Sequence, residues 1–347
     1  MSRYAESYDF DKLQGPGDSR PTALQIIRDE KRENAFVGKV AIITGCSSGI
    51  GPPTAEALVA TGATVYCTAR NVASAKEALG PALLNTGRVH VLFMDHTDLS
   101  TVKAASDEIH RRESAVSILI NNAGVMTVPT RTETKDGFEL QIGTNHFAHF
   151  YFFCLLRDLL EAGSTPEFAS RVVNVSSAAH RIGHLHLDDL QLAKEGAYTP
   201  EAGYAASKRA NIYMANEIDR KYGSTARDKG VIHGYSVMPG GIRTPLQRYM
   251  VEYFEEALKV PFVVRYMRSP EQGAATSIFA AVAHELEGKG GVYLENCALG
   301  VELPGPHETL DMADATAYGY APGAFDSVKE AALWTESLKL VGLPQDF

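Results

Sequence analysis

The chain has 347 residues, of which 45% are hydrophobic and 22% charged, and its formal net charge is −9 at pH 7. This length and apolar content suffice for one large hydrophobic core. A nucleic-acid-binding protein needs a basic face to neutralise phosphates, so the negative net charge argues against that class.

The cysteines and the hydropathy pattern bear on where the protein resides. The four cysteines are widely spaced and form no C-x-x-C pair, which argues against a disulfide framework and favours a reducing compartment. The most apolar run, residues 147–160, contains His149 and Arg157 and is too short and too polar to span a bilayer. The N-terminal residues lack the apolar stretch of a secretory signal. We therefore expect a cytoplasmic protein without a membrane span.

The first 37 residues are polar and form an N-terminal extension. They contain the turn-rich segment GPGDSRP, typical of a loop, and one short predicted helix over residues 22–33. This extension is either a docking arm or disordered, and the pattern leaves both open. Residues 38–347 contain no repeat or low-complexity linker, so they are predicted to form one domain.

From residue 39 onward, apolar runs alternate with amphipathic segments. The predicted strands cover residues 40–44, 64–68, 89–94, 117–121, 171–176, 231–238 and 291–294. The predicted helices cover residues 50–61, 100–112, 138–162, 202–222 and 270–286. Strands that are apolar throughout and alternate with helices indicate a parallel sheet covered on both faces. The predicted fold is therefore α/β, a single-domain, doubly wound Rossmann sheet of about seven strands.

A glycine-rich turn, TGCSSGIG, follows the first predicted strand over residues 44–51 and precedes a helix. Glycines allow a tight turn and let the backbone approach a pyrophosphate, which then sits at the helix N-terminus. The alternative is a plain tight turn without a ligand. The residues of this turn predicted to contact a dinucleotide are Gly45, Ser48, Gly49, Ile50 and Gly51.

Arg70 stands at the end of the second predicted strand. An acidic residue there would hold the ribose diol of NAD, whereas an arginine suits the 2′-phosphate of NADP. A solvated surface arginine is the alternative. The sequence therefore favours NADP (NADPH) as the cofactor.

A tyrosine and a lysine four residues apart begin a predicted helix, and the strand before that helix ends in a serine. The i, i+4 spacing places the Tyr204 phenol and the Lys208 ammonium on one helix face. A neighbouring positive charge favours the phenolate, so we expect Lys208 to lower the pKa of Tyr204 and make it a general acid/base. Ser177 lies at the carboxyl edge of the sheet, where it can hydrogen-bond a substrate oxygen. An exposed helical Tyr–Lys pair is the alternative.

Together these segments resemble the short-chain dehydrogenase/reductase family, which pairs T-G-x-x-x-G-x-G with N-N-A-G, a serine, Y-x-x-x-K and a P-G loop. The motifs occur in family order across roughly residues 38–295. The phrases VNVSSAAH and HLHLDDLQ are similar to the family's retinol-dehydrogenase-like branch. The resemblance implies that Asn145 supports a water-mediated proton relay to Lys208. It also implies cofactor contacts from Asp95, Asn122, Ala123, Gly124, Pro239, Gly240, Ile242 and Thr244.

Three further segments have competing interpretations. Histidines at 180, 184 and 186 lack the spacing of known metal ligands, so we expect loop packing or pocket lining and no metal site. The apolar stripe over residues 147–155 indicates core packing, and the resemblance adds that this helix and the Tyr204 helix often form a dimer interface. Residues 245–268, the family's substrate lid, are rich in Tyr, Phe, Met and Val. They either contact a lipophilic substrate or pack the lid's own helices.

The sequence thus predicts an NADP(H)-dependent oxidoreductase that interconverts a ketone or aldehyde and an alcohol, as a homo-oligomer with a small-molecule substrate. One alternative is an enzyme resembling the sugar-nucleotide epimerases, which also use Y-x-x-x-K. Those proteins usually carry T-G-x-x-G-x-x-G, which this chain does not match. The other alternative is a catalytically silent cofactor-binding protein, although such proteins tend to lose a catalytic residue and none is missing here.

Overall fold

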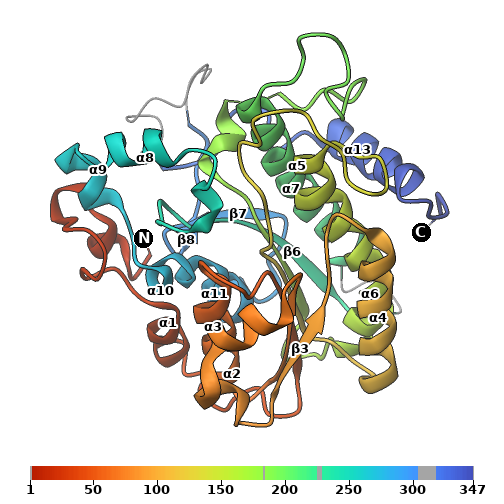
Figure 1. The fold of residues 1–347 in the computed structure, drawn as a ribbon. Coiled ribbons are helices and arrows are strands. Elements are labelled where there is room, and N and C mark those ends of the chain that lie inside the picture. The colour runs from red at the N-terminus through yellow and green to blue at the C-terminus, as the bar shows by residue number, and fades with distance from the viewer. Residues whose placement is uncertain (1, 183, 225–228, 304–317, 347) are drawn as a thin grey trace.

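The computed structural model describes residues 2–182, 184–224, 229–303 and 318–346 (Figure 1). Its centre is one eight-stranded sheet in the order β3-β2-β1-β4-β5-β6-β7-β8. The first seven strands run parallel to their neighbours, and β8 pairs antiparallel to β7. The strands are β1 Val40–Thr44, β2 Thr64–Ala69, β3 Val89–Phe93, β4 Ile118–Asn121, β5 Ser170–Val175, β6 Ile232–Met238, β7 Val292–Glu295 and β8 Ala298–Leu299.

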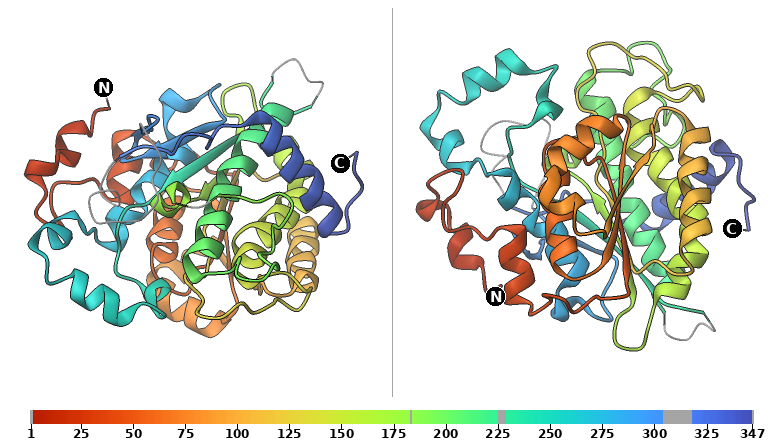
Figure 2. Two further views of the ribbon diagram at one scale, coloured as in Figure 1. Left: turned by 90° about the horizontal axis from the view of Figure 1, so that it is seen from above. Right: turned by 60° about the horizontal axis from the view of Figure 1, so that its bottom comes forward.

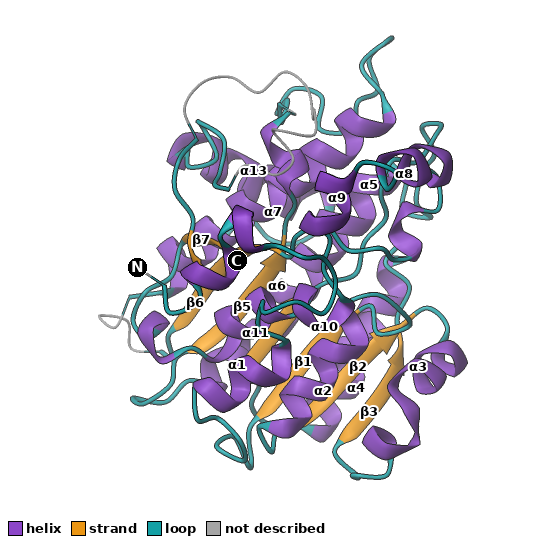
Figure 3. Cartoon of the chain, turned by 90° about the vertical axis from the view of Figure 1, so that its left-hand side faces the viewer, coloured by secondary structure: helices purple, strands orange, loops and turns teal. Residues whose placement is uncertain are grey.

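Helices cover both faces of this sheet, as Figure 3 shows. One face packs against α1, α2, α3 and α11, and the other against α4, α6, α7 and α13. The bounds are α1 Ala23–Asp29, α2 Gly51–Ala60, α3 Val72–Leu84, α4 Leu99–Arg112, α5 Leu140–Ile142, α6 Ala148–Gly163, α7 Pro200–Tyr222, α8 Val251–Ala257, α9 Pro261–Tyr266, α10 Pro270–Gly273, α11 Ala275–Val282 and α13 Ser327–Leu340. The predicted doubly wound fold is confirmed.

The predicted helix over residues 138–162 is broken. The structure has α5, then a π-helix over Gly143–Phe147, then α6. The Ala148 amide donates to the carbonyl of Gly143, five residues earlier, so one extra residue is accommodated in the turn. Apolar periodicity does not reveal such a bulge, which often marks a functional site. The predicted helix over residues 270–286 is likewise divided into α10, α11 and a 3₁₀ turn.

The N-terminal extension packs on the domain, so the described part of the extension is not disordered; its role as a docking arm stays a prediction. Tyr4, Tyr8 and Leu13 are buried, and α1 lies in the same core cluster as α2 and α11. The Thr22 hydroxyl accepts from the Gln25 amide and caps α1. Both views in Figure 2 place the extension beside α8 and α9.

Helix α13 covers the faces of α6 and α7 that the resemblance associates with dimers. The Trp334 indole packs edge-on against Phe150, with ring centroids 4.9 Å apart, and also contacts Phe153 and Tyr222. The Asn216 amide donates to the Glu330 carboxylate at 2.7 Å. Phe147, Phe150 and Cys154 of the apolar stripe are buried, as the core-packing interpretation expects. In the described part of the chain, no helix has the length and apolar content needed to cross a membrane.

Candidate active site

A cleft of about 430 Å³ opens at the carboxyl ends of the parallel strands. In an α/β sheet this edge is where ligands bind, because the loops that leave the strands converge there. The predicted residues lining the cleft are Gly45, Ser48, Gly49, Ile50, Arg70, Asp95, Asn122, Ala123, Gly124, Ser177, Tyr204, Lys208, Pro239, Gly240, Ile242 and Thr244. Two further predicted residues, Gly51 and Asn145, are buried behind the cleft wall.

The glycine-rich turn joins β1 to α2. Gly49 has φ of +66°, which favours glycine. A methyl group on Gly45 would lie 2.8 Å from the Ala123 Cα, and one on Gly51 would lie 2.1 Å from the Gly45 carbonyl oxygen. These two glycines therefore let the turn fold onto itself and leave the α2 N-terminus facing the cleft. Pro52 and Pro53 in the first turn of α2 have no N–H, so the backbone N–H groups left there for a pyrophosphate are those of the turn itself, up to Gly51.

The Thr44 hydroxyl connects the glycine-rich turn to the Asn-Asn-Ala-Gly segment. It accepts from the backbone amides of Asn122 and Ala123, both at 2.9 Å. With both acceptor positions used, the hydroxyl proton points to His149 Nε2, 2.9 Å away. His149 then carries its proton on Nδ1 and donates to the Asn145 carbonyl at 3.0 Å. Sequence reasoning assigned no role to Thr44 or His149, and the one signal was the four-residue spacing of Asn145 and His149.

Tyr204 and Ser177 lie together on the cleft wall. Thr199 caps α7 and Pro200 occupies its first turn, so Tyr204 is in the second turn of the helix. Ser177 follows β5 and caps a short 3₁₀ helix through the Ala179 amide. Burial raises the pKa of Tyr204 to about 12, although its side-chain hydrogen bond with Ser177 lowers it. The phenol is therefore protonated at neutral pH.

Lys208 is one helical turn further along α7. Its ammonium donates to the Val175 carbonyl at 2.9 Å and lies 5.6 Å from the centroid of the Tyr204 ring. Burial lowers the pKa of Lys208 to about 8, so it remains mainly charged at pH 7. Burial and the hydrogen bond with Ser177 are the two influences on the pKa of Tyr204 that the structure shows. That Lys208 and an oxidised nicotinamide together favour the phenolate stays a prediction.

Asn145 stands in the π-helix and faces away from the cleft opening. Its amide group donates to the Val125 carbonyl and the Ser207 hydroxyl, and its oxygen accepts from the Val125 amide, all at 2.9 Å. A methyl group on Gly124 would lie 3.1 Å from the Asn145 oxygen and 3.7 Å from Lys208 Nζ. The structure thus brings Asn145 and Lys208 to the same side of Gly124, as the resemblance implies. The relay itself stays a prediction.

Arg70 and Asp95 lie at the other end of the cleft. Arg70 is exposed at the rim, next to Asn71, which caps α3 through the Ser74 amide. One Asp95 carboxylate oxygen accepts from the amide and hydroxyl of Thr97 at 3.0 and 2.9 Å. These contacts orient the carboxylate.

The Pro239–Thr244 loop follows β6 and closes the cleft opposite Tyr204. Gly240 has φ of +99°, and a methyl group there would lie 2.4 Å from Arg268 Nε. The Thr244 hydroxyl accepts from the Leu246 amide, and the Thr244 amide donates to the Gln247 side chain at 2.8 Å. Met126, Met238 and Leu246, which sequence reasoning did not single out, also line the cleft and give it an apolar wall.

The three histidines after β5 differ in their contacts. His180 Nδ1 donates to the Ser177 carbonyl at 2.6 Å, and its Nε2 accepts from the Ala321 amide at 3.2 Å. The rings of His184 and His186 are 6.2 Å apart. Among the residues whose positions are described, no group of three or more His, Cys, Asp or Glu side chains has the arrangement of a metal site.

The lid comprises α8 and α9. Every residue of α8 is at least partly exposed, and Tyr249 and Tyr253 are 47% and 55% exposed. Val263, Tyr266 and Met267 of the same segment are buried. The described residues therefore do not decide between the two interpretations of residues 245–268.

Residues 39–253 match the sequence model of the short chain dehydrogenase family. The short-chain dehydrogenase/reductase prx1 of Penicillium roqueforti is 44% identical over 337 residues, covering 97% of this chain and 94% of its own length. Oxidoreductase calI of Penicillium decumbens is 36% identical, covering 100% of this chain and 99% of its own. Mouse retinol dehydrogenase 11 is 34% identical, covering 89% and 88%.

Solved structures agree with the fold. The crystal structure of an uncharacterised protein from Mycobacterium paratuberculosis has a TM-score of 0.64 at 29% identity, covering 89% of this chain and 95% of its own. The NADP complex of RhlG from Pseudomonas aeruginosa has a TM-score of 0.57 at 21% identity, covering 76% and 96%. The family match, the relatives and the spacing of Ser177, Tyr204 and Lys208 agree: the chain belongs to the short-chain dehydrogenase/reductase family and has relatives among the retinol dehydrogenases.

Proposed function

We propose that the protein is an NADP(H)-dependent reductase or dehydrogenase that interconverts a lipophilic ketone or aldehyde and its alcohol. The observation that supports this most directly is the meeting of Ser177, Tyr204 and Lys208 on one wall of a single cleft that also contains the glycine-rich turn. A nicotinamide bound in this cleft supplies or accepts a hydride at the carbonyl carbon.

The chain's own groups handle the oxygen and its proton. The Ser177 hydroxyl binds the carbonyl oxygen, and Tyr204 donates its phenolic proton as negative charge develops there. A phenol with a pKa of about 12 carries that proton at neutral pH, as reduction requires. The buried Lys208 ammonium binds ribose hydroxyls and favours the phenolate once the proton has left. Asn145 supports the return of a proton from solvent by way of Lys208.

Arg70 supports the choice of NADP. It is an exposed cation at the cleft rim, next to the residues that follow β2, where the adenosine ribose of a dinucleotide lies in this fold. A guanidinium there binds a 2′-phosphate through paired hydrogen bonds.

The apolar wall and the exposed aromatic residues of the lid support a lipophilic substrate. Met126, Met238 and Leu246 line the cleft, and Tyr249 and Tyr253 of the predicted lid are exposed. A cytoplasmic location and a homo-oligomer remain part of the proposal. Because α13 packs on α6 and α7, a homo-oligomer would use a surface other than these two helices.

The test is the loss of NADPH absorbance with a panel of lipophilic ketones and aldehydes, and its gain from NADP⁺ with the matching alcohols. We expect net turnover in both directions. An epimerase would convert its substrate without net change in NADPH, and a silent binding protein would bind NADPH and consume none. Either result would contradict the proposal.

A further inference from the structure

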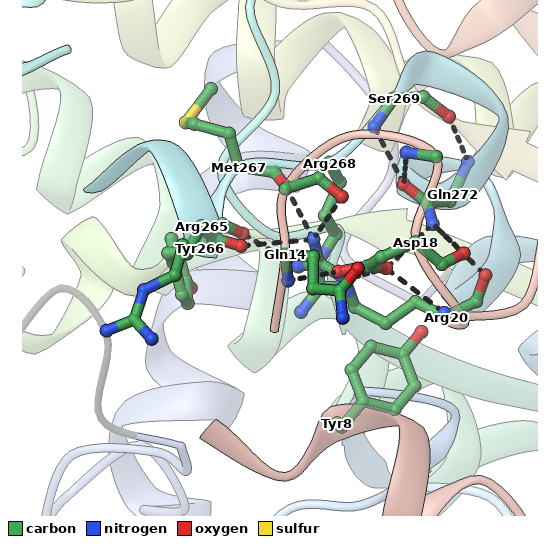
Figure 4. A network of polar contacts seen from close by, with 12 residues as sticks. Tyr8, Gln14, Asp18, Arg20, Arg265, Tyr266, Met267, Arg268, Ser269 and Gln272 are labelled. Carbon is green, nitrogen blue, oxygen red and sulfur yellow. Dashed lines mark hydrogen bonds and ion pairs between the residues drawn. The ribbon is translucent and has the colours of Figure 1, made fainter. Parts of the chain in front are cut away.

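The N-terminal extension contacts the end of the lid. The rings of Phe10 and Phe262 have centroids 4.8 Å apart, and the Arg265 guanidinium lies 5.8 Å from the Phe10 ring. Figure 4 shows the polar part of this contact, in which Arg20 reaches the backbone of the segment that leaves α9. Two segments 246 positions apart in sequence are therefore joined next to the cleft.

Arg20 is the centre of the contact. Its side chain is 0% exposed, and it donates to the carbonyls of Tyr266 at 2.7 Å, Met267 at 2.6 Å and Arg265 at 3.3 Å. It also donates to the Gly15 carbonyl at 3.2 Å and to the Asp18 carboxylate at 2.8 Å. A guanidinium has five N–H donors in a fixed plane. Here Nε binds the carboxylate, Nη1 binds the Tyr266 carbonyl, and the two N–H groups of Nη2 are shared among the other three carbonyls.

These carbonyls need donors because the helix ends there. Helix α9 covers Pro261–Tyr266, and Met267 leaves it with ψ of 151°. The last carbonyls of a helix have no partner within the helix, and a cation at this end also interacts favourably with the helix dipole. Arg20 therefore caps α9 from a distant part of the chain.

Asp18 and Gln272 hold Arg20 in place. Burial opposes ionisation of Asp18, but hydrogen bonds from Arg20 and neighbouring amides keep the pKa of its carboxyl below the usual value. The Gln272 side chain accepts from the amides of Gly17 and Ser269, both at 3.0 Å. Its amide group donates to the carbonyls of Asp18 and Arg20, at 3.2 and 3.1 Å. Asp18 thus fixes the Arg20 guanidinium, and Gln272 of α10 fixes the backbone that carries it.

The segment held by Arg20 forms the support behind the cleft. Arg268 Nη1 donates to the Pro239 carbonyl at 3.0 Å, and the Arg268 amide donates to the Gly241 carbonyl at 2.8 Å. A methyl group on Gly241 would lie 3.1 Å from both Met267 Sδ and Tyr266 Cε1. Any shift of residues 266–268 is therefore transmitted to the loop at Pro239–Gly241, which lines the cleft.

We propose that Arg20 is a positioning residue of the substrate site, which sets the end of the lid and, through Arg268, the loop at Pro239–Gly241. The inference rests on the proposed function, because it assigns the extension to the recognition of the carbonyl compound. Arg70 and Asp95 follow β2 and β3, which lie on the other side of β1 from β6 in the sheet. We therefore expect binding of the cofactor's adenosine half to depend little on Arg20.

The test compares Arg20→Ala and Arg20→Lys with the full-length wild-type protein. In Arg20→Ala we expect amide hydrogen exchange over residues 261–268 to rise at least ~10-fold, because the capped turn opens locally. The KM for the carbonyl substrate should rise at least ~5-fold, and the NADPH Kd should rise less, because the adenosine half of the cofactor keeps its contacts. Arg20→Lys should give intermediate values, because an ammonium keeps the charge but lacks the planar fork. If Arg20→Ala does not fold, the hydrogen exchange and KM of Arg20→Lys provide the test.

Arg171→Lys is the matched control. Arg171 is equally buried and donates to the carbonyls of Ala280 and Ala283 at the end of α11, at 3.1 and 2.9 Å. It lies at the start of β5, at the sheet edge opposite the cleft. Arg171→Lys should therefore lower the thermal stability of the protein and leave the KM for the carbonyl substrate unchanged.

Unchanged exchange over residues 261–268 in both Arg20 variants would overturn the inference, as would an equal rise in KM in Arg171→Lys. Failure of the proposed function looks different, because the wild-type protein would then consume no NADPH with any carbonyl. The exchange measurement needs no turnover. It therefore decides whether Arg20 holds residues 261–268 even if no carbonyl substrate is found.

Discussion

At the scale of single residues, the site is governed by burial more than by paired charges. Tyr204 and Lys208 are both buried, and burial shifts each pKa towards the neutral form, to about 12 and about 8. The resting site therefore holds a neutral phenol beside a lysine that is charged below pH 8. The Lys208 ammonium lies 5.6 Å from the centroid of the Tyr204 ring.

Arg70 carries the cofactor prediction at this scale. Arg70→Ala should raise the Kd for NADPH at least ~10-fold, because a charge-assisted contact to a phosphate contributes about 1.5–3 kcal/mol. The Kd for NADH, which lacks the 2′-phosphate, should change less than about twofold. Both constants can be measured from the fluorescence of the bound nicotinamide.

Arg111→Ala is the control for net charge, because it removes the same charge from an exposed position at the end of α4, at the opposite sheet edge. Equal losses for NADPH and NADH in Arg70→Ala would refute the assignment of the 2′-phosphate to this residue.

At the scale of elements, most of the sheet and the cleft could be predicted because they follow local patterns. Val40–Thr44 and Ile232–Met238 are mainly apolar and buried throughout. The glycine-rich turn and Tyr204–Lys208 have fixed spacing, so their positions follow from sequence. The π-helix around Asn145 and the kink at Gly80–Pro81 in α3 depend on backbone geometry that periodicity does not encode.

Long-range contacts account for what remained unpredicted. The capping of α9 by Arg20 and the packing of α13 on α7 join residues far apart in the chain, and no local pattern indicates either. His149 was missed for the same reason, since its role is visible only when Thr44 is brought beside it.

The packing of α13 makes a stability prediction. Trp334 is 3% exposed and its indole contacts three aromatic rings of α6 and α7. Trp334→Ala should lower the free energy of unfolding by about 3–5 kcal/mol, through lost burial and the cavity left behind. Val328→Ala, on the same helix but 77% exposed, should change it by less than about 0.5 kcal/mol. Urea denaturation measures both, and similar values for the two would show that α13 is not part of the core.

At the scale of the whole molecule, buried neutral histidines make folding sensitive to acid. Burial lowers the pKa of His146 from 6.5 to about 3, and that of His96 to about 4. Below pH 6.5 each of these histidines binds a proton in the unfolded chain but stays neutral in the folded chain. The free energy of unfolding that they contribute is therefore fully present above pH 6.5 and is lost as the pH falls towards 3.

His146→Gln tests this dependence. Between pH 7 and pH 5 the wild-type protein should lose about 2 kcal/mol more unfolding free energy than the variant, the value expected for one histidine of ordinary pKa that stays neutral when folded. The exposed His184→Gln should lose as much as the wild-type protein. Parallel pH curves for wild type and His146→Gln would contradict the assignment.

The central claim is that Tyr204 donates the proton in carbonyl reduction, and Tyr204→Phe tests it most directly. We expect kcat to fall by about 10²–10⁴-fold with the NADPH Kd within about threefold, because only the acidic proton is removed. Tyr213 lies on the same helix as Tyr204, and its hydroxyl donates to the Gly323 carbonyl. Tyr213→Phe removes only that hydroxyl and should keep wild-type kcat. Wild-type turnover by Tyr204→Phe would contradict the account.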